Sequence, residues 1–310
     1  MNDQNAITVV ESAPFQELTG LTLKAVAGSS ARVYAQTFRS WAMFCAGNNL
    51  GVLDFAPGYV LDFLAAQNTT KATRQRQLAA MRKLAQMLYV LRPTDENRRY
   101  YEALKIIKAP APEQNAGERV QKALSPSEAD KLLRVWEGDT NISRRNRALI
   151  AVLLLSGIRR SEAAALQWPD IDFENGVLTV RHGKGDKRRD VPLAGEYAIK
   201  ALKDWQFAQA SGRSYVFCSV NKGDNPGPDA PLTGTDVYRT WRATCERASV
   251  DSTKPHDARR TFITEALATG TPIQTVQAAA GHARGDTTLQ YAKTVSARRA
   301  RKELRLRYGD

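Results

Sequence analysis

Four short segments of this 310-residue chain carry side chains that can act together on a phosphate ester. They are residues 156–162 (SGIRRSE), 183–189 (GKGDKRR) with 191–193 (VPL), 256–259 (HDAR), and 281–282 (GH), the last followed nine residues later by Tyr291. The side chains of interest are Arg159, Lys184, His256, Arg259, His282 and Tyr291. Residues of these types bind phosphate oxygens, transfer protons and attack phosphorus.

These residue types permit a phosphodiester to be cut and resealed without water, through a covalent intermediate that stores the bond energy. A tyrosine hydroxyl can attack phosphorus and later leave again, so Tyr291 is the candidate nucleophile. The forked guanidinium groups of Arg159 and Arg259 can hold the non-bridging oxygens, over which the transition state spreads its charge. His256 lies three residues before Arg259, on the same face of a helix, and can hydrogen-bond the phosphate or accept the tyrosine proton.

Each segment taken alone has a plainer interpretation. Arg159 near Gly157 is typical of a charge on a helix surface, and Gly-Lys-Gly is typical of a solvated turn. Gly281 is typical of a helix C-terminus, and Tyr291 of a half-buried packing residue. The joint occurrence of the segments in this order on a basic chain favours the catalytic interpretation.

The order Arg, Lys, HxxR, His, Tyr and the gaps between them resemble the tyrosine recombinase (phage integrase) family, over essentially residues 118–295 and more weakly through the N-terminal helices. The resemblance implies that Lys184 is the general acid for the leaving 5′-oxygen, that His282 adds a second phosphate hydrogen bond, and that Glu162 orients active-site side chains. Arg260 departs from the pattern, because many relatives carry a second histidine there.

The same resemblance implies a site-specific DNA recombinase that forms a covalent 3′-phosphotyrosyl intermediate. It implies a homotetramer on two short core sites of double-stranded DNA, with no cofactor and no metal ion. Residues 76–82 (RQLAAMR) are similar to a DNA-facing helix of Xer and Cre-type recombinases, and residues 117–119 (GER) and 215–218 (YVFC) look like Cre, which however carries tryptophan where His282 stands.

Two other functions are compatible with the same residues. A type IB topoisomerase uses a related Arg/Lys/Arg/His/Tyr set to relax DNA, and a non-catalytic DNA-binding regulator could descend from the same fold. The basic helical N-terminal module favours recombination over relaxation. The complete set of catalytic residue types speaks against a regulator.

The charge of the chain also indicates a polyanionic partner. The sequence has 45 Lys and Arg against 32 Asp and Glu, a formal net charge of +13. Basic residues cluster between Lys71 and Lys108 and again between Ser296 and Asp310. The longest apolar run, from Ala148 to Leu155, has eight residues, which is far too short to span a membrane. We therefore expect double-stranded DNA rather than a membrane as the partner, and a cytoplasmic, nucleoid-associated protein.

The elements that position these residues form two predicted domains in a mainly α protein. Residues 1–20 lack periodicity and are expected to be a flexible tail. Apolar spacing predicts an N-terminal four- to five-helix domain over 21–108, with helices at 29–47, 57–64, 71–91 and 96–107. By resemblance this is the SAM-like core-binding domain. The basic face of helix 71–91 gives the predicted DNA contacts Lys71, Arg74, Arg76, Arg82 and Lys83.

Residues 109–117 have linker composition, and residues 118–310 form the predicted catalytic domain. Ser125 and Glu128 make a capping box, and residues 144–155 read as a buried helix. Asn175-Gly176 and Gly183-Lys184-Gly185 are turn signals that predict a small three-stranded antiparallel sheet, so this domain is α+β. Helices are predicted at 195–210, 235–249, 257–268, 272–280, 286–293 and 295–308, and by resemblance the last serves protomer exchange. The three cysteines are far apart and read as packing residues.

Overall fold

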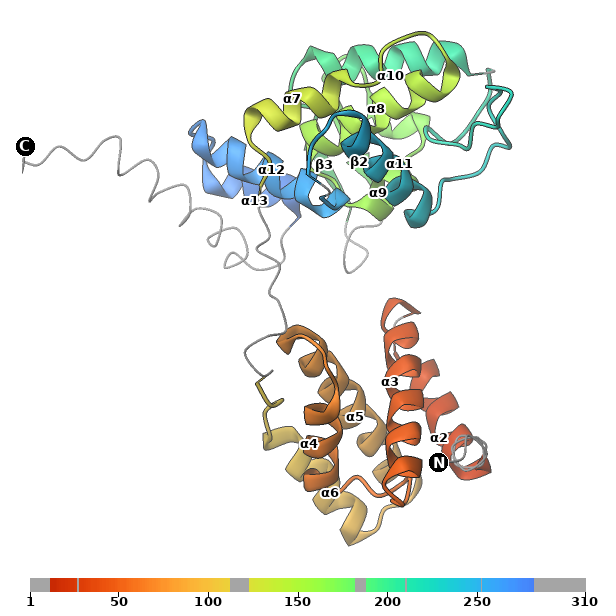
Figure 1. Ribbon diagram of the computed structural model, residues 1–310, viewed down its shortest axis with the longest axis vertical. Coiled ribbons are helices and arrows are strands. Elements are labelled where there is room, and N and C mark those ends of the chain that lie inside the picture. The colour runs from red at the N-terminus through yellow and green to blue at the C-terminus, as the bar shows by residue number, and fades with distance from the viewer. Residues whose placement is uncertain are drawn as a thin grey trace, which may run out of the picture. The chain divides into compact units, whose positions relative to one another are not determined.

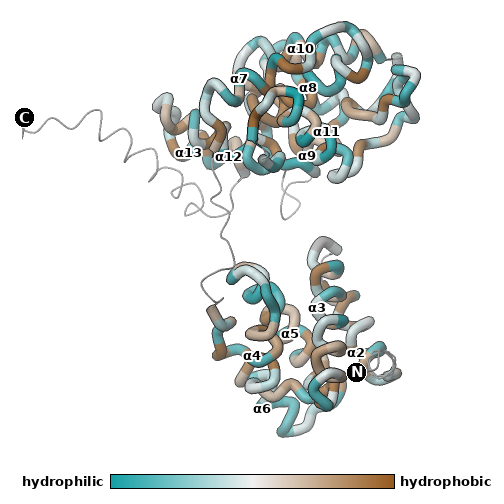
Figure 2. Tube along the Cα trace, in the orientation of Figure 1, coloured by the Kyte–Doolittle hydropathy of each residue, from teal (hydrophilic) through white to brown (hydrophobic). Residues whose placement is uncertain are grey.

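The computed structural model describes residues 12–26, 28–111, 123–181, 188–209, 211–251 and 253–281 (Figure 1). The chain divides into two compact units, residues 1–120 and 121–310. The predicted linker, residues 109–117, ends just before this division; its residues 112–117 lie outside the described residues, as do the predicted helices 286–293 and 295–308. Each unit has its own hydrophobic core, and Figure 2 shows the hydrophobic residues where the helices of each unit face one another.

In the described part of the first unit, all the regular elements are helices. Its helices are α2 (Ala13–Lys24), α3 (Gly28–Gly47), α4 (Pro57–Ala66), α5 (Lys71–Leu91) and α6 (Asp95–Ile106). Threonine side chains accept a backbone N–H at the start of α5 and of α6, so the polar residues before these helices act as N-caps. In the core the ring of Trp41 lies edge-on to Phe63, and its indole N–H donates to the carbonyl oxygen of Val52 over 2.9 Å.

The expected flexible tail is wrong for residues 13–20, because α2 begins at Ala13. Phe15, Leu18 and Thr22 are buried, at a spacing of three and four residues that places them on one helix face. This face packs on α3 and α5. The apolar stripe is short, so the helix is stabilised mainly by its packing on the neighbouring helices. Local periodicity in the sequence did not indicate it for that reason.

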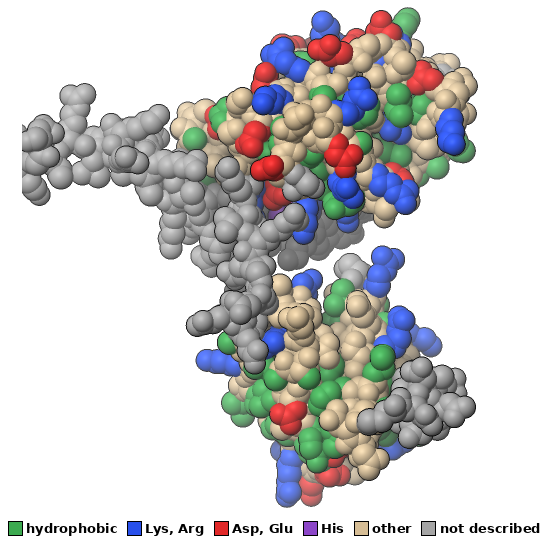
Figure 3. Space-filling view, viewed as in Figure 1, with side chains coloured by type: hydrophobic (Ala, Val, Ile, Leu, Met, Phe, Trp, Pro, Cys, Tyr) green, Lys and Arg blue, Asp and Glu red, His purple; other side chains and the backbone are tan. Residues whose placement is uncertain are grey.

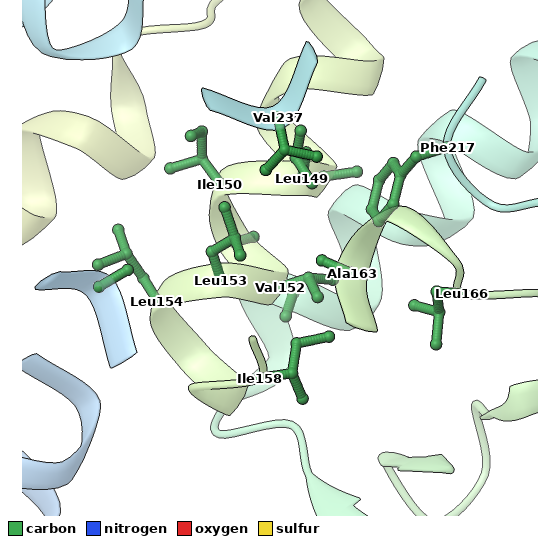
Figure 4. Close-up of a cluster of buried hydrophobic side chains, with 14 of the residues drawn as sticks. Leu149, Ile150, Val152, Leu153, Leu154, Ile158, Ala163, Leu166, Phe217 and Val237 are labelled. Atoms are coloured by element: carbon green, nitrogen blue, oxygen red, sulfur yellow. The ribbon is translucent and has the colours of Figure 1, made fainter. Parts of the chain in front are cut away.

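The second unit is built around α8 (Asn141–Ser156), a helix buried on most sides. The other helices of the described part are α7 (Pro126–Arg134), α9 (Arg160–Ala164), α10 (Glu196–Ala208), α11 (Gly234–Arg247), α12 (Pro255–Ala268) and α13 (Ile273–Ala280). Helices α7, α10 and α12 all pack on α8. Figure 4 shows the core side chains Leu149, Val152 and Leu153 of α8 with Phe217 and Val237 from later segments. The buried helix and the predicted capping box at Ser125 and Glu128 are confirmed.

A small sheet lies in the same unit. Strands β1 (Ile171–Asp172), β2 (Val177–Val180) and β3 (Arg189–Pro192) pair antiparallel in the order β1-β2-β3, with Leu178 opposite Ile171 on one side and Val191 on the other. A single 3-10 turn, η1 (Trp168–Asp170), leads into β1. The predicted three-stranded sheet and the α+β character of this unit are confirmed, and the turn at 183–185 lies outside the described residues.

Two further findings bear on the sequence interpretation. All three cysteines are buried free thiols, which confirms them as packing residues. None of the helices in the described part of the chain is both long and apolar enough to cross a bilayer.

Candidate active site

The first candidate segment, residues 156–162, forms the junction between α8 and α9. Gly157 ends α8 in the left-handed conformation, at φ 64°, and a Cβ there would come within 2.5 Å of Cδ1 of Phe262 on α12. Arg159 is the N-cap of α9, and its backbone N–H donates to Oε2 of Glu162 over 2.8 Å. The tight turn therefore needs glycine for both its backbone and its packing, and it presents Arg159 beside α12.

Helix α12 carries the HxxR residues at its N-terminal end. The backbone N–H of Lys254 donates to the carboxylate of Asp257, which begins the helix in register. Arg259 is 2% exposed and donates from Nη1 to the carbonyl oxygen of Gly157 over 2.9 Å. His256 is exposed, in the first turn of the helix, where backbone N–H groups and the helix dipole favour an anion.

The environment of His256 favours its neutral form. Partial loss of hydration, followed by the positive charges of Arg259, Arg260 and Arg159, lowers the pKa of its imidazole below the ordinary 6.5. A neutral imidazole can accept a proton at neutral pH. The positive charge of Arg259 near His256 thus lowers the pKa of the imidazole, which suits a proton acceptor.

The C-terminal end of α13 gathers three arginines. Nη2 of Arg159 donates to the carbonyl oxygen of Gly281 over 3.1 Å, Nη2 of Arg259 donates to that of Ala280, and Nε of Arg189 donates to that of Ala279 over 3.2 Å. The last carbonyls of a helix lack partners inside the helix and carry a partial negative charge, so cations are favoured there. These contacts bring the two predicted catalytic arginines side by side.

Glu162 lies behind Arg159 as a fixed negative charge. Its side chain is 4% exposed and accepts from Nη1 of Arg159 over 2.7 Å and from Nη1 and Nη2 of Arg189 over 3.0 and 2.7 Å. Burial by itself would raise the pKa of Glu162. The hydrogen bonds from Arg189 and Arg159 outweigh it and bring the pKa to about 2. The carboxylate is therefore ionised throughout the physiological range.

The structure brings Arg159, Glu162, His256 and Arg259 together as the sequence predicts, from segments about a hundred residues apart. Lys184, His282 and Tyr291 lie outside the described residues. The residue that sequence reasoning missed is Arg189, which stood inside a predicted motif without a role. The sequence signal that could have found it is the alternation of side chains along a strand. Arg189 is two residues before the buried Val191, so the two side chains lie on the same, inward face of β3.

One predicted DNA contact of the first unit is wrong. Arg74 is buried, and it donates from Nη1 to the carbonyl oxygen of Ala111 over 2.8 Å and from Nη2 to that of Gln67 over 2.9 Å. Leu78 and Met81 follow it by four and seven residues, so Arg74 lies on the core side of α5. Its guanidinium group therefore hydrogen-bonds carbonyl oxygens of the segments next to α5.

The other predicted contacts divide into two groups. The guanidinium of Arg82 donates to the carbonyl oxygens of Leu104 and Ile107, both over 2.6 Å, and so ties α5 to the end of α6. Lys71 and Arg76 are exposed, and Lys83 is half-buried beside Gln86. Figure 3 shows basic side chains on the visible face of each unit.

Comparison with known proteins decides the family. The sequence profile described as the phage integrase family matches residues 122–298, more than half of the chain. The chain belongs to the phage integrase family. Members of this family are site-specific tyrosine recombinases that transfer DNA strands, so this member is an enzyme of DNA recombination.

Curated relatives and solved structures agree with that assignment. The tyrosine recombinase XerC of Halalkalibacterium halodurans is 28% identical over 240 residues, 75% of each chain. XerC of Pelobacter propionicus is 29% identical over 266 residues, 83% of this chain and 82% of that one. The fold resembles XerH recombinase bound to palindromic difH substrate in a post-cleavage complex, with a TM-score of 0.71 and 23% identity over 97% of this chain and 89% of that one. The Tn1549 transposon integrase, in complex with transposon right end DNA, gives a TM-score of 0.63 at 16% identity over 93% and 99%.

Proposed function

We propose that this recombinase cuts and rejoins double-stranded DNA at a short core site by forming a covalent 3′-phosphotyrosyl bond through Tyr291. The observation that carries the proposal is the convergence of Arg159 and Arg259 on neighbouring carbonyl oxygens at the end of α13, with His256 on the same helix as Arg259. Two guanidinium groups side by side suit the two non-bridging oxygens of one phosphate.

The charge balance of the site supports an anionic substrate. Arg159 and Arg189 both donate to the carboxylate of Glu162, so two cations face one anion, and Arg259 lies beside them, donating to the carbonyl oxygen of Ala280. Arg159 is 25% exposed and so remains accessible to a ligand while Glu162 and Gly281 hold it from within. A guanidinium anchored in this way stabilises developing negative charge without having to reorganise.

The proton transfers follow from the chemistry of the remaining residues. The Tyr291 oxygen attacks phosphorus, its proton passes to a base, and the 5′-oxygen leaves as it takes a proton. His256, held neutral by its surroundings, is the proposed proton acceptor or phosphate donor. Lys184 is the proposed acid for the 5′-oxygen, and His282 the proposed second hydrogen-bond donor to the phosphate. We propose that neither a cofactor nor a metal ion takes part.

A DNA duplex nicked near the cleavage site tests this proposal, because loss of the short strand traps the covalent complex. The wild-type chain in EDTA should yield a protein–DNA adduct that survives denaturation, and Tyr291→Phe should yield none while binding the same DNA. An adduct that persists in Tyr291→Phe would show that another residue is the nucleophile.

The first unit is the proposed core-DNA-binding domain over residues 21–108, with Lys71, Arg76 and Lys83 as contacts to phosphates. Phosphate contacts release counterions, so DNA affinity should fall steeply with added salt. A flat salt dependence would contradict this role. The remainder from residue 118 is the proposed catalytic domain, and we propose that the protein works in the cytoplasm at the nucleoid.

A groove in the second unit supports assembly through the C-terminal segment. It has a volume of about 350 Å³ and is formed by apolar side chains of α7, α8, α12 and α13, among them Leu133, Leu155, Phe262 and Val276. Residues 295–308 carry Leu304, Leu306 and Tyr308 on a basic segment, and Glu265 at the groove supplies an opposite charge. We propose that this segment fills the groove of a neighbouring protomer and builds a tetramer on two core sites.

Removal of the chain after Thr294 tests the docking role. The truncated chain should retain most of its DNA affinity and its ability to form the covalent adduct at Tyr291, but should lose recombination between two sites. Because Leu155→Arg would place a charge in the groove itself, it should have the same effect in the full chain. Unchanged recombination in the truncated chain would refute docking.

A further inference from the structure

Arg189, the first residue of β3, joins two parts of the active site that are distant in the sequence. Nη1 and Nη2 of its guanidinium donate to the two carboxylate oxygens of Glu162 on α9, and Nε donates to the carbonyl oxygen of Ala279 on α13. The side chain is 12% exposed. All three nitrogens of the guanidinium thus donate to protein acceptors, and these contacts join β3 to α9 and to α13.

The place of Arg159 depends on the carboxylate that Arg189 holds. Oε1 of Glu162 accepts from Nη1 of Arg159 and also from Nη1 of Arg189. A two-pronged contact fixes the plane of a carboxylate, whereas a single contact leaves it free to turn. Arg189 therefore fixes the oxygen atom against which Arg159 rests.

Arg189 also controls the end of α13. Gly281 follows this helix at φ 61°, and a Cβ on it would lie 2.7 Å from Nε and 2.8 Å from Cδ of Arg189. The Arg189 side chain thus fills the space that a larger residue at 281 would need. Because Arg159 and Arg259 donate to the carbonyl oxygens of Gly281 and Ala280, a shift of this helix end would move both.

We propose that Arg189 is a positioning residue for strand transfer: it holds Glu162 and the end of α13 in one arrangement and so sets the guanidinium of Arg159 where the scissile phosphate binds. The inference rests on the catalytic role proposed for Arg159. Arg189 also balances charge, because without it the buried Glu162 would have Arg159 as its cation. Arg159 would then be drawn into a full ion pair that competes with the phosphate.

The test is the single-turnover rate of cleavage of the nicked duplex at saturating protein, with DNA affinity measured in parallel. Arg189→Met should slow cleavage by about 100-fold, the effect of a displacement of about 1 Å in a catalytic group, and change DNA affinity by less than about twofold. Arg189→Lys keeps the charge but cannot reach both oxygens of Glu162 and Ala279 together, so its rate should lie between those of Arg189→Met and the wild type.

Two comparisons separate positioning from a general loss of structure. Once Arg159 is replaced by methionine, the further change Arg189→Met should cost less than it does in the wild type, because part of its effect passes through Arg159. On DNA whose scissile phosphate has a methyl group in place of a non-bridging oxygen, the Arg189→Met penalty should shrink to about tenfold or less, since a neutral phosphate needs less cationic stabilisation. The matched control is Arg134→Met, which removes an exposed arginine paired with Asp130 in the same unit and should cleave at the wild-type rate.

The outcomes distinguish this inference from the proposed function. Wild-type cleavage by Arg159→Met would refute the role of Arg159 itself. Slow cleavage by Arg159→Met with rapid cleavage by Arg189→Met, or losses that multiply in the double variant, would overturn the inference alone. If Arg189→Met fails to fold by circular dichroism, Arg189→Lys decides: a wild-type rate, or a loss equal on charged and neutral phosphates, overturns positioning.

Discussion

Replacement of Gly157 by alanine should destabilise the second unit and disturb its active site together. Gly157 has φ 64°, where an L-residue costs about 1–2 kcal/mol. The new Cβ would also lie 2.5 Å from Cδ1 and 2.8 Å from Cγ of Phe262, and overpacking of this kind costs about 1–3 kcal/mol. The two effects together predict a loss of about 2–5 kcal/mol, a large part of the stability of a typical domain.

Urea denaturation measures this loss, and Gly270→Ala is its matched control. Gly270 also has a positive φ, 94°, but a Cβ there would have no atom of the described residues within 4 Å. The control should therefore lose about 1–2 kcal/mol, from backbone strain alone. Removal of the ring by Phe262→Ala should relieve the collision, so the double variant with Gly157→Ala should lose less than the sum of the two single losses.

The same change should lower the rate of DNA cleavage. The carbonyl oxygen of Gly157 accepts from Arg259, and Phe262 lies on the helix that carries His256 and Arg259. A displaced Phe262 would move both. Equal losses of stability in Gly157→Ala and Gly270→Ala, or additive losses in the double variant, would refute the account of this junction.

Three further predictions concern individual charges. Arg74→Met should lower the free energy of unfolding of the first unit by about 2 kcal/mol, because carbonyl oxygens lose their donor, and should leave the salt dependence of DNA binding unchanged. Arg76→Met should instead reduce the slope of log affinity against log salt concentration by about 1. The reverse pattern would contradict the structural role of Arg74. The pKa of Glu162 is lowered from 4.5 to about 2, so its ionised form stabilises the fold by about 3 kcal/mol above pH 4.5. This stabilisation is lost as the pH falls toward 2. Urea titrations at pH 7 and pH 3 should therefore show a smaller loss of stability with acid in Glu162→Gln than in the wild type. Because the pKa of His256 is lowered, it should remain a proton acceptor until the pH falls below 6.5, so the cleavage rate should show an acid limb with its midpoint below that value, and His256→Gln should lack this limb.

The sequence predicts those parts of the fold that local patterns determine. The helix predicted at 144–155, the hairpin at Asn175-Gly176 and the capping box at Ser125 depend on neighbours within a few residues, and all are present, the helix extending over 141–156. Helix α2 was missed because its short apolar face is stabilised by packing on α3 and α5. Tertiary partners of this kind leave no mark on local periodicity.

The sequence predicts which residues belong to the candidate site but not which atoms they contact. The order and spacing of the motifs predict Arg159, His256 and Arg259 as one site, and in the structure Arg159 and Arg259 donate to neighbouring carbonyl oxygens with His256 on the helix of Arg259. The interpretation of Arg74 as a DNA contact failed because a basic residue on a basic helix has the same sequence signal whether it faces DNA or the carbonyl oxygens of its own chain. Arg189 went unassigned for a related reason: its value lies in contacts with α9 and α13, which only the folded chain brings to β3.

The identity of the residue bonded to DNA tests the central claim most directly. After trapping on the nicked duplex, digestion with trypsin and nuclease followed by mass spectrometry should find a nucleotide on the peptide of residues 285–293, in which Tyr291 is the one tyrosine. The bond should join the tyrosine oxygen to a 3′-phosphate. A nucleotide on any other peptide, or a bond through a 5′-phosphate, would contradict the mechanism proposed for this recombinase.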